Sequence, residues 1–174
     1  MGPTKGLVII NTGNGKGKTT AALGMLFRAW GNDMKVVMLQ FLKSPDSKTG
    51  ERQAAQRIGI EVVTGGAGFV FDPDDDRGHK AAAIDQWQTA KVKIGSGKYD
   101  MVILDELTYP LQFGWISVDE VIEVLKKRPV NLHVVITGRN APQALIDFAD
   151  TAVEVSDIKH HFNNGIKAQP GIEF

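Results

Sequence analysis

The chain contains no cysteine among its 174 residues. Disulfides, thiolate zinc sites and cysteine nucleophiles are therefore excluded together, and a reducing compartment fits this composition. Neither sign of charge is in excess, because 20 Lys and Arg balance 20 Asp and Glu, so we expect no broad surface for nucleic acid or membrane. No apolar run approaches the roughly 18 residues of a membrane span. The first residues also lack the apolar core of a signal peptide, so we predict a cytoplasmic protein.

The composition is that of a globular chain with one substantial core. Hydrophobic residues make up 43% and charged residues 23%. At this length a single domain over residues 1–174 needs neither disulfides nor metal for stability. Short apolar runs alternate with longer amphipathic segments, which predicts crossover connections. We therefore expect an α/β fold with a mostly parallel central sheet and helices on both faces.

The apolar runs predict six strands, and most of them lack polar alternation, as in parallel strands that are buried on both faces. The predicted strands are 7–11, 35–41, 61–64, 101–105, 132–137 and 151–155. The predicted helices are 18–30, 50–58, 81–94, 118–127 and 141–148. Two segments, 65–77 and 157–174, fit neither pattern. Ligands of such sheets bind at the carboxyl ends of the strands, where we look for the site.

The most specific motif lies between the first predicted strand and the first predicted helix. Its sequence is Thr-Gly-Asn-Gly-Lys-Gly-Lys-Thr-Thr, and glycines there let backbone N–H groups curl around an anion. The following helix adds the positive end of its dipole. We predict a nucleoside triphosphate here, with charge from Lys18 and a hydroxyl for Mg²⁺ from Thr19. The predicted binding residues are Gly13, Asn14, Gly15, Lys16, Gly17, Lys18, Thr19 and Thr20.

The motif departs from the general phosphate-loop pattern, G-x-x-x-x-G-K-[ST], at its first glycine. Counting back from Gly17, that position is Thr12, whereas Gly13 and Gly15 lie inside the loop. The alternative is a glycine-rich turn that binds nothing. It explains neither the two lysines nor the tandem threonines.

A pair of carboxylates ends the fourth predicted strand. Asp105 and Glu106 follow the apolar run 101–104. In P-loop proteins a strand of this kind ends beside the phosphates, and its acid helps to hold Mg²⁺. We predict that one of the two acids reaches the metal directly or through water. The sequence leaves open which one.

Other candidate groups follow three further strands. Arg139 ends a buried strand, where its guanidinium could reach a triphosphate or pair with a surface acid. Lys43 ends the second strand, and we expect it to be solvated rather than close to the ligand. Phe69 and Phe71 lie on a glycine-rich loop and would point the same way on an extended backbone. They suit a flat hydrophobic ligand, or they fasten the loop to the core.

Together these segments resemble the P-loop-type ATP:corrinoid (cob(I)alamin) adenosyltransferases. The matching segments are 12–20, 40–43, 68–69, 104–107, 137–139, 149–150, 159–160 and 171–174, which span nearly the whole chain. The altered glycine spacing is that family's own variant. The resemblance implies a P-loop NTPase-like (RecA-like) domain. It also implies transfer of the 5′-deoxyadenosyl group of ATP to reduced cobalt, with release of triphosphate, from ATP held in reversed orientation.

The resemblance further implies roles for particular residues. Lys18, Glu106 and Arg139 would be catalytic, with Arg139 also contacting ATP. Thr19, Asp105 and Glu106 would hold Mg²⁺.

Phe69 and Phe71 would lie beneath the corrin ring and displace its lower axial ligand, which eases reduction of cobalt. Many relatives have tryptophan in place of Phe71. The implied partners are the corrinoid (cobalamin), ATP and an electron-donating flavoprotein, and a homodimer is possible. About five residues precede the first strand, so the tail after Asp157 is the candidate cover for the corrinoid.

Two other readings remain at this stage. A P-loop kinase or ATPase would share Lys18, the carboxylates and Arg139, but it would release ADP or phosphate instead of triphosphate. A regulator that binds the corrinoid or the nucleotide would show tight binding without turnover.

Overall fold

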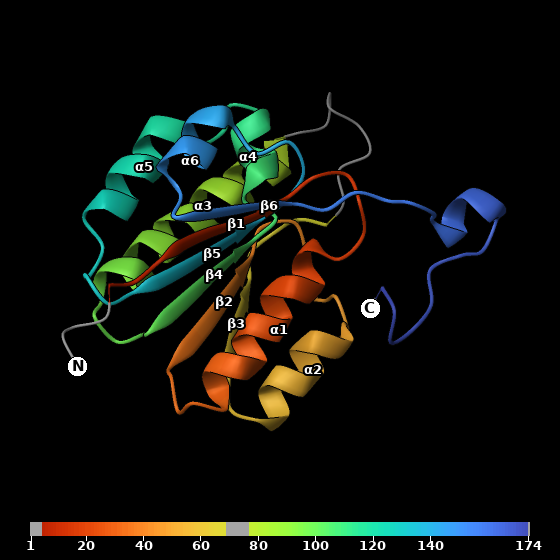
Figure 1. Cartoon of the computed structure of the whole chain (residues 1–174), viewed down its shortest axis with the longest axis horizontal. Helices are drawn as coiled ribbons and strands as arrows, with labels where there is room; N and C mark the ends of the chain where they lie inside the picture. Colours follow the sequence, from red (N-terminus) through yellow and green to blue (C-terminus); the bar gives the residue numbers. More distant parts are fainter. Residues whose placement is uncertain (1–4, 69–76, 174) are drawn as a thin grey trace.

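A six-stranded sheet forms the centre of the molecule (Figure 1). The computed structural model describes residues 5–68 and 77–173. The strands are β1 (Val8–Thr12), β2 (Val36–Gln40), β3 (Glu61–Thr64), β4 (Met101–Asp105), β5 (His133–Thr137) and β6 (Thr151–Glu154). They pair in parallel in the order β3-β2-β4-β5-β1-β6. The predicted α/β class is confirmed, and every predicted strand is present with its ends shifted by at most one residue.

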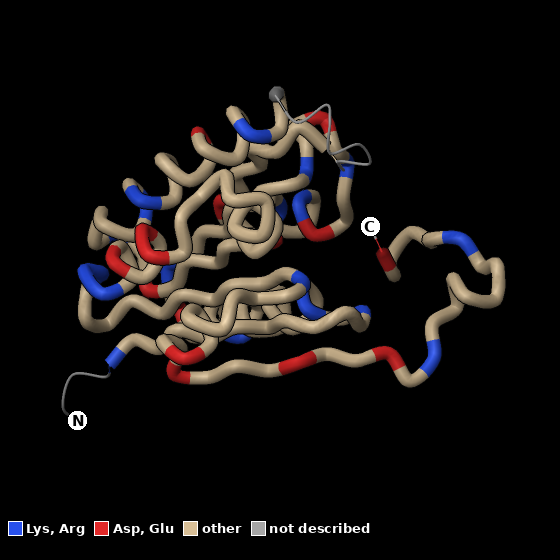
Figure 2. Tube along the Cα trace, turned by 90° about the horizontal axis from the view of Figure 1, so that it is seen from above, with Lys and Arg blue, Asp and Glu red and all other residues tan. Residues whose placement is uncertain are grey.

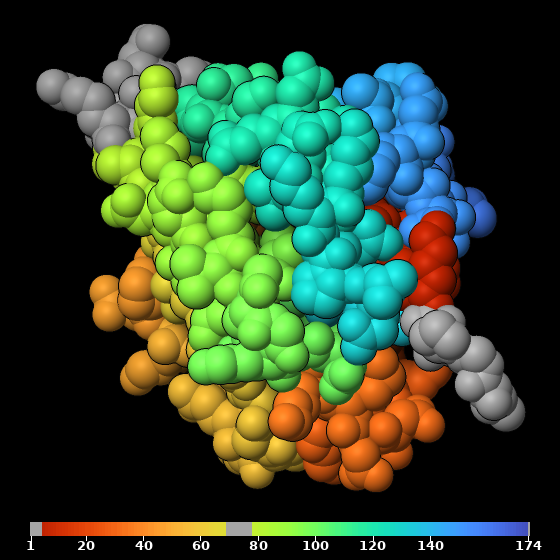
Figure 3. All heavy atoms as spheres, turned by 90° about the vertical axis from the view of Figure 1, so that its left-hand side faces the viewer, coloured from red at the N-terminus to blue at the C-terminus, as the bar shows by residue number. Residues whose placement is uncertain are grey.

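Helices cover both faces of this sheet. One face carries α1 (Lys18–Trp30) and α2 (Gly50–Arg57). The other carries α3 (Arg77–Gly95), α4 (Thr108–Gln112), α5 (Val118–Lys126) and α6 (Gln143–Phe148). Figure 3 looks at the side where the strands begin, and it shows the orange and gold layer of α1 and α2 beneath the green and cyan layer of α3 and α5.

The strands divide the apolar side chains between two cores. In β2, Val37 and Leu39 pack with α3, α4, α5 and α6, whereas Val36 and Met38 pack with α1 and α2. Successive side chains of a strand point to opposite faces, so a run of apolar residues contributes side chains to both cores. This is why the central strands read as continuous apolar runs in the sequence.

Two elements were not predicted. The short helix α4 begins two residues after Glu106, and the tail contains the 3₁₀ turn η2 (His161–Asn164). Beyond β6 the tail extends past the carboxyl ends of the strands and then turns back toward the body (Figures 1 and 2). In the part of the chain that the structure describes, none of the helices combines the length and apolar character that crossing a bilayer requires.

Candidate active site

The strand order brings the predicted site segments to one edge of the sheet. β4, β5 and β1 are consecutive neighbours and run parallel, so their carboxyl ends lie side by side. The phosphate loop follows β1, Asp105 and Glu106 end β4, and Arg139 follows β5. The structure therefore gathers the predicted nucleotide and metal residues at the edge where α/β sheets bind ligands.

The backbone of the phosphate loop requires its glycines. Gly13 and Gly17 have φ angles of 95° and 126°, which side chains rarely allow. A Cβ atom on Gly13 would lie 2.4 Å from the carbonyl oxygen of Val155, and one on Gly15 would lie 2.7 Å from the carbonyl carbon of Ser156. The two glycines that depart from the general pattern are thus the ones that the chain after β6 passes most closely.

Lys18 lies within this loop and begins α1. Its ammonium Nζ donates to the carbonyl oxygen of Gly15 at 2.7 Å, and the residue is only 7% exposed. Burial lowers the pKa of Lys18, while the nearby Glu106 carboxylate acts in the opposite direction. The first helical hydrogen bond runs from the N–H of Ala21 to Gly17. The N–H groups that precede it lie at the positive end of the helix dipole, which favours an anion.

The outer side of the loop is bonded to the chain after β6. The N–H of Gly15 donates to the carbonyl oxygen of Val155 at 2.8 Å, and the N–H of Lys16 donates to Asp157 Oδ1 at 2.9 Å. In this arrangement those two N–H groups hold the loop against the chain after β6. An anion would instead meet the N–H groups around Gly17 and Lys18.

The Lys16 side chain extends this anchorage to the end of the tail. Its ammonium donates to the carbonyl oxygen of Ile172 at 2.8 Å and lies 3.3 Å from Glu173 Oε1. The same carboxylate oxygen lies 3.1 Å from His161 Nε2. The tail is therefore docked on the phosphate loop, although its predicted role as a cover for the corrinoid stays a prediction.

Asp105 is buried and orients a side chain of the loop. Its Oδ1 accepts hydrogen bonds from the hydroxyls of Thr19 and Thr137, each at 2.8 Å, and the residue is 1% exposed. Its Oδ2 accepts from Gln40 Nε2 at 3.3 Å. Both carboxylate oxygens are thus engaged by neutral donors, which fix the direction of the Thr19 hydroxyl.

Glu106 differs from its neighbour in conformation and in partners. Its φ angle is +62°, an uncommon value outside glycine, and its N–H donates to the Thr137 hydroxyl at 3.0 Å. Its Oε2 atom is buried and has no hydrogen-bond partner among residues 5–68 and 77–173. Burial raises the pKa of Glu106 to about 7, helped by the like charge of Asp105 and opposed by Lys18 and Arg139. Of the two carboxylates, Glu106 is thus the one with an oxygen atom left to coordinate a cation, whereas both oxygens of Asp105 accept hydrogen bonds.

Arg139 lies in a turn between β5 and α6. The turn is fixed at both ends, because the N–H of Gly138 donates to the Asn11 carbonyl at 3.2 Å and the N–H of Ala141 donates to the Thr12 hydroxyl at 3.0 Å. The charge of Arg139 also acts on the pKa values of both Lys18 and Glu106. Arg139 therefore lies at the same edge of the sheet as the phosphate loop, and its contact with a triphosphate stays a prediction. Its side chain is exposed.

The expectation that Lys43 is solvated is wrong. Its ammonium pairs with Glu51 of α2, and only 19% of its side chain is exposed. Glu51 also accepts from Gln40 Nε2 at 3.3 Å. Hydrogen bonds thus connect Thr19 through Asp105, Gln40 and Glu51 to Lys43. The short motif 40–43 signalled two of these residues, but nothing in the local sequence marked Glu51 as their partner.

Phe69 and Phe71 lie outside the described residues. The chain leading to them is anchored at the end of β2, because the N–H of Gly66 donates to the Lys43 carbonyl and the N–H of Gly68 to the Leu42 carbonyl, both at 3.0 Å. A Cβ atom on Gly66 would lie 2.3 Å from the Leu42 carbonyl carbon. The glycine at position 66 thus permits close packing beside the candidate site.

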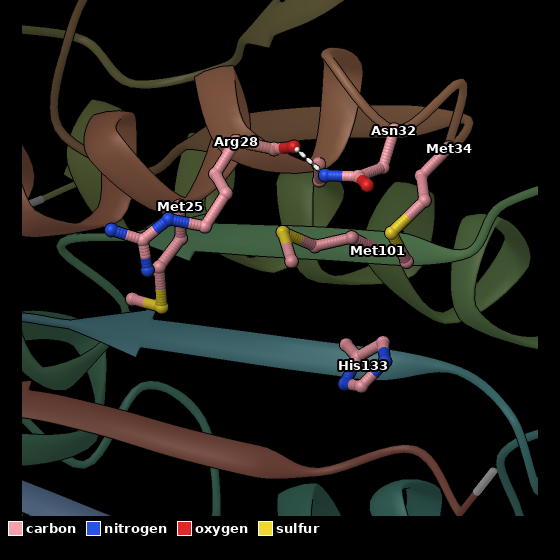
Figure 4. Close-up of a pocket in the computed structure, with 7 residues that line it drawn as sticks. Met25, Arg28, Asn32, Met34, Met101 and His133 are labelled. Carbon is pink, nitrogen blue, oxygen red and sulfur yellow. Dashed lines mark hydrogen bonds between the residues drawn. The ribbon is translucent and has the colours of Figure 1, made fainter.

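Two hollows lie between the helices and the sheet. One, of about 390 Å³, opens between α1 and α2, has mostly apolar walls and reaches Thr20 and Glu51. The other, of about 190 Å³, lies where the strands begin, and Met101 and His133 line it from the sheet (Figure 4). It contains none of the predicted site residues and lies at the opposite end of the strands from the phosphate loop.

Comparison with known proteins identifies the family. The profile of the family described as ATP:corrinoid adenosyltransferase BtuR/CobO/CobP matches residues 4–174. The chain belongs to this family. The corrinoid adenosyltransferase of Escherichia coli K12 is 40% identical over 170 residues, which cover 98% of this chain and 86% of the relative. That of a Sinorhizobium species is 43% identical over 174 residues, covering 98% and 81%.

Membership of the adenosyltransferase family confirms the resemblance found in the sequence. This family consists of enzymes, and the alternative of a P-loop kinase or ATPase is not favoured. Among solved structures, the flagellar accessory protein FlaH of Methanocaldococcus jannaschii has a TM-score of 0.60 at 10% identity, covering 87% of this chain and 71% of that chain. This likeness concerns the fold alone.

Proposed function

We propose that this protein transfers the 5′-deoxyadenosyl group of ATP to the cobalt of a reduced corrinoid and releases triphosphate. The observation that carries the proposal is the arrangement of Lys18, Glu106 and Arg139 around one phosphate loop, in a chain of the ATP:corrinoid adenosyltransferase family. Both substrates follow from the chemistry that defines this family.

The phosphate loop suits the departure of a polyphosphate. A reduced cobalt centre is itself a strong nucleophile, so the protein needs no general base to activate it. The remaining tasks are to hold the ribose C5′ in line with cobalt and to stabilise the charge that grows on the leaving triphosphate. Lys18, the first turn of α1 and Arg139 supply positive charge and N–H donors for the second task. For this, Lys18 exchanges its bond to the Gly15 carbonyl for phosphate oxygen.

The donor set beside the loop fits Mg²⁺. Magnesium prefers oxygen ligands, and the Thr19 hydroxyl and the carboxylates of Asp105 and Glu106 provide them. Glu106 Oε2, buried without a partner among the described residues, is the atom that a cation would satisfy. Asp105 already holds the Thr19 hydroxyl at 2.8 Å, so we assign it the orienting role and Glu106 the direct contact. When bound, the ion would neutralise charge on the triphosphate and act as a template for it.

The corrinoid and its electron supply extend the proposal. We assign Phe69 and Phe71 to the lower face of the corrin ring, as the family resemblance implies, and a reducing flavoprotein to the delivery of electrons. The anchorage of residues 65–68 beside β2 supports this assignment, because these residues, which lead to Phe69, lie at the same edge of the sheet as the phosphate loop.

A product assay tests the proposed reaction. Chemically reduced cobalamin, Mg-ATP and protein are mixed anaerobically in the dark, and we expect a light-sensitive cobalt–carbon product with one triphosphate released per corrinoid. Lys18→Ala should abolish the product, whereas the matched control Lys126→Ala, on the exposed surface of α5, should leave it unchanged. Release of ADP or phosphate instead would refute adenosyl transfer, and tight binding without any product would favour the regulator.

A further inference from the structure

The helix α4 connects two parts of the candidate site. It begins two residues after Glu106, and its side chains at positions 108 and 112 share one face because residues four apart are neighbours on a helix. That face meets the turn of Gly138, Arg139 and Asn140. The helix therefore spans the distance between the free carboxyl and the arginine.

The contact between α4 and the turn is close at Thr108. This residue is fully buried, and a Cβ atom on Gly138 would lie 2.0 Å from its hydroxyl oxygen. Only glycine fits between the turn and the helix at this point.

The contact is specific at Gln112. Its Nε2 donates to the carbonyl oxygen of Arg139 at 2.7 Å, and its Oε1 accepts from Asn140 Nδ2 at 3.2 Å. The same Nε2 lies 3.2 Å from the Thr108 carbonyl oxygen, which keeps the side chain against its own helix. One carboxamide thus holds the main chain of Arg139 and the side chain of its neighbour.

The turn also contains two residues with positive φ angles. Asn140 has a φ angle of +48° and Gly138 one of +141°. Glycine adopts such angles freely, and asparagine tolerates the left-handed region better than most other residues. The hydrogen bonds around the turn therefore select this conformation. Asn11 and Thr12 hold the turn from the β1 side, and Gln112 holds it from the α4 side.

We propose that Gln112 is a positioning residue for Arg139. It fixes the point from which the guanidinium extends, relative to Glu106 at the other end of the same helix. The inference rests on the proposed function, in which Arg139 stabilises the departing triphosphate. Because that charge is greater in the transition state than in bound ATP, loss of the support lowers kcat more than it raises the KM for ATP.

Three variants test this role. Gln112→Ala removes both hydrogen bonds to the turn, and Gln112→Glu keeps the shape but replaces the donor to Arg139 with a repelling oxygen. Both should lower kcat about three- to tenfold, the range expected for the net worth of one hydrogen bond, with the KM for ATP changed less than about twofold. The control Gln143→Ala removes a similar carboxamide bond, from Nε2 to Asp147 Oδ1 at 2.8 Å on the exposed face of α6, and should leave kcat unchanged.

A double-mutant cycle separates positioning of Arg139 from general support of the fold. In an Arg139→Ala background, Gln112→Ala should change kcat less than about twofold, because the group that it positions is gone. Equal losses in both backgrounds would overturn the inference, as would an unchanged kcat in the single variants. Thermal unfolding of each variant shows that the comparison is made on folded protein.

Binding of inorganic triphosphate provides a second readout that does not need turnover. Calorimetry should show weaker binding in Gln112→Ala by a similar factor, and no further weakening when Arg139 is already alanine. If wild-type protein makes no adenosylated corrinoid, the proposed function fails while this binding cycle still tests the positioning. If wild-type protein turns over but the cycle is additive, the positioning alone fails.

Discussion

The replacement Glu106→Gln tests the electrostatics at the centre of the site. It keeps the shape of the side chain and removes its ionisable proton. In the folded protein, burial and the neighbouring Asp105 raise the pKa of Glu106 from an ordinary 4.5 to about 7. In the unfolded chain the same carboxyl ionises near its ordinary value.

The sign of the effect on stability follows from proton binding. Between pH 4.5 and 7 the folded state holds a proton on Glu106 that the unfolded state has lost, so raising the pH favours unfolding. From 4.5 to about 7, at ~1.4 kcal/mol per pH unit, this amounts to about 3 kcal/mol of stability lost across the window. Above pH 7 both states are ionised and no further loss is expected from this group.

Urea unfolding at several pH values measures this quantity. In the presence of EDTA, the stability of Glu106→Gln relative to wild type should rise by about 2 to 3 kcal/mol between pH 5 and pH 8. The control Glu123→Gln should leave the slope in this range unchanged, because Lys126 lowers the pKa of Glu123 below its ordinary value. Parallel pH profiles for wild type and Glu106→Gln would refute the reasoning. Adding Mg²⁺ at pH 8 should then stabilise wild type more than the variant.

Three further outcomes follow from the phosphate loop. Lys18→Ala should abolish detectable binding of inorganic triphosphate in calorimetry, because it removes the buried charge of the loop; unchanged affinity would disprove that role. Gly15→Ala should lower the free energy of unfolding by about 1–3 kcal/mol in urea, because its Cβ would lie 2.7 Å from Ser156, and full stability would show that the segment moves freely aside. Lys16→Ala should release the tail, seen as faster proteolysis within residues 157–173, whereas an unchanged cleavage pattern would mean that other contacts hold it.

Much of the fold could be read from the sequence because its strands are continuous apolar runs between turn residues. The helix α4 escaped prediction for a physical reason. It has only five residues, contains Pro110, and begins three residues after the end of β4, so no helical period can be recognised in it. Its existence depends on tertiary packing, since Leu107 and Leu111 are buried in the core below the sheet edge.

The candidate site residues could be named from the sequence, but the contacts that each of them makes could not. Asp105 and Glu106 are adjacent carboxylates, but Asp105 ends β4 whereas Glu106 lies beyond it with a φ angle of +62°, and the two side chains have different surroundings. Lys43 was misjudged because its partner Glu51 lies on the next helix, where a local pattern cannot reveal it. The same holds for Gln112, whose contacts with Arg139 join segments 27 residues apart.

The edge position of β6 affects how firmly the phosphate loop is held. β1 lies between two neighbours, whereas β6 is the last strand of the sheet and all four of its side chains are exposed. Gly15 and Lys16 take their partners from the residues that continue this weakly supported strand. Local unfolding begins where few buried contacts resist it. The amide protons of Gly15 and Lys16 should therefore exchange with solvent as fast as local opening of β6 allows. The amide proton of Ile10, in the central part of β1, should exchange much more slowly.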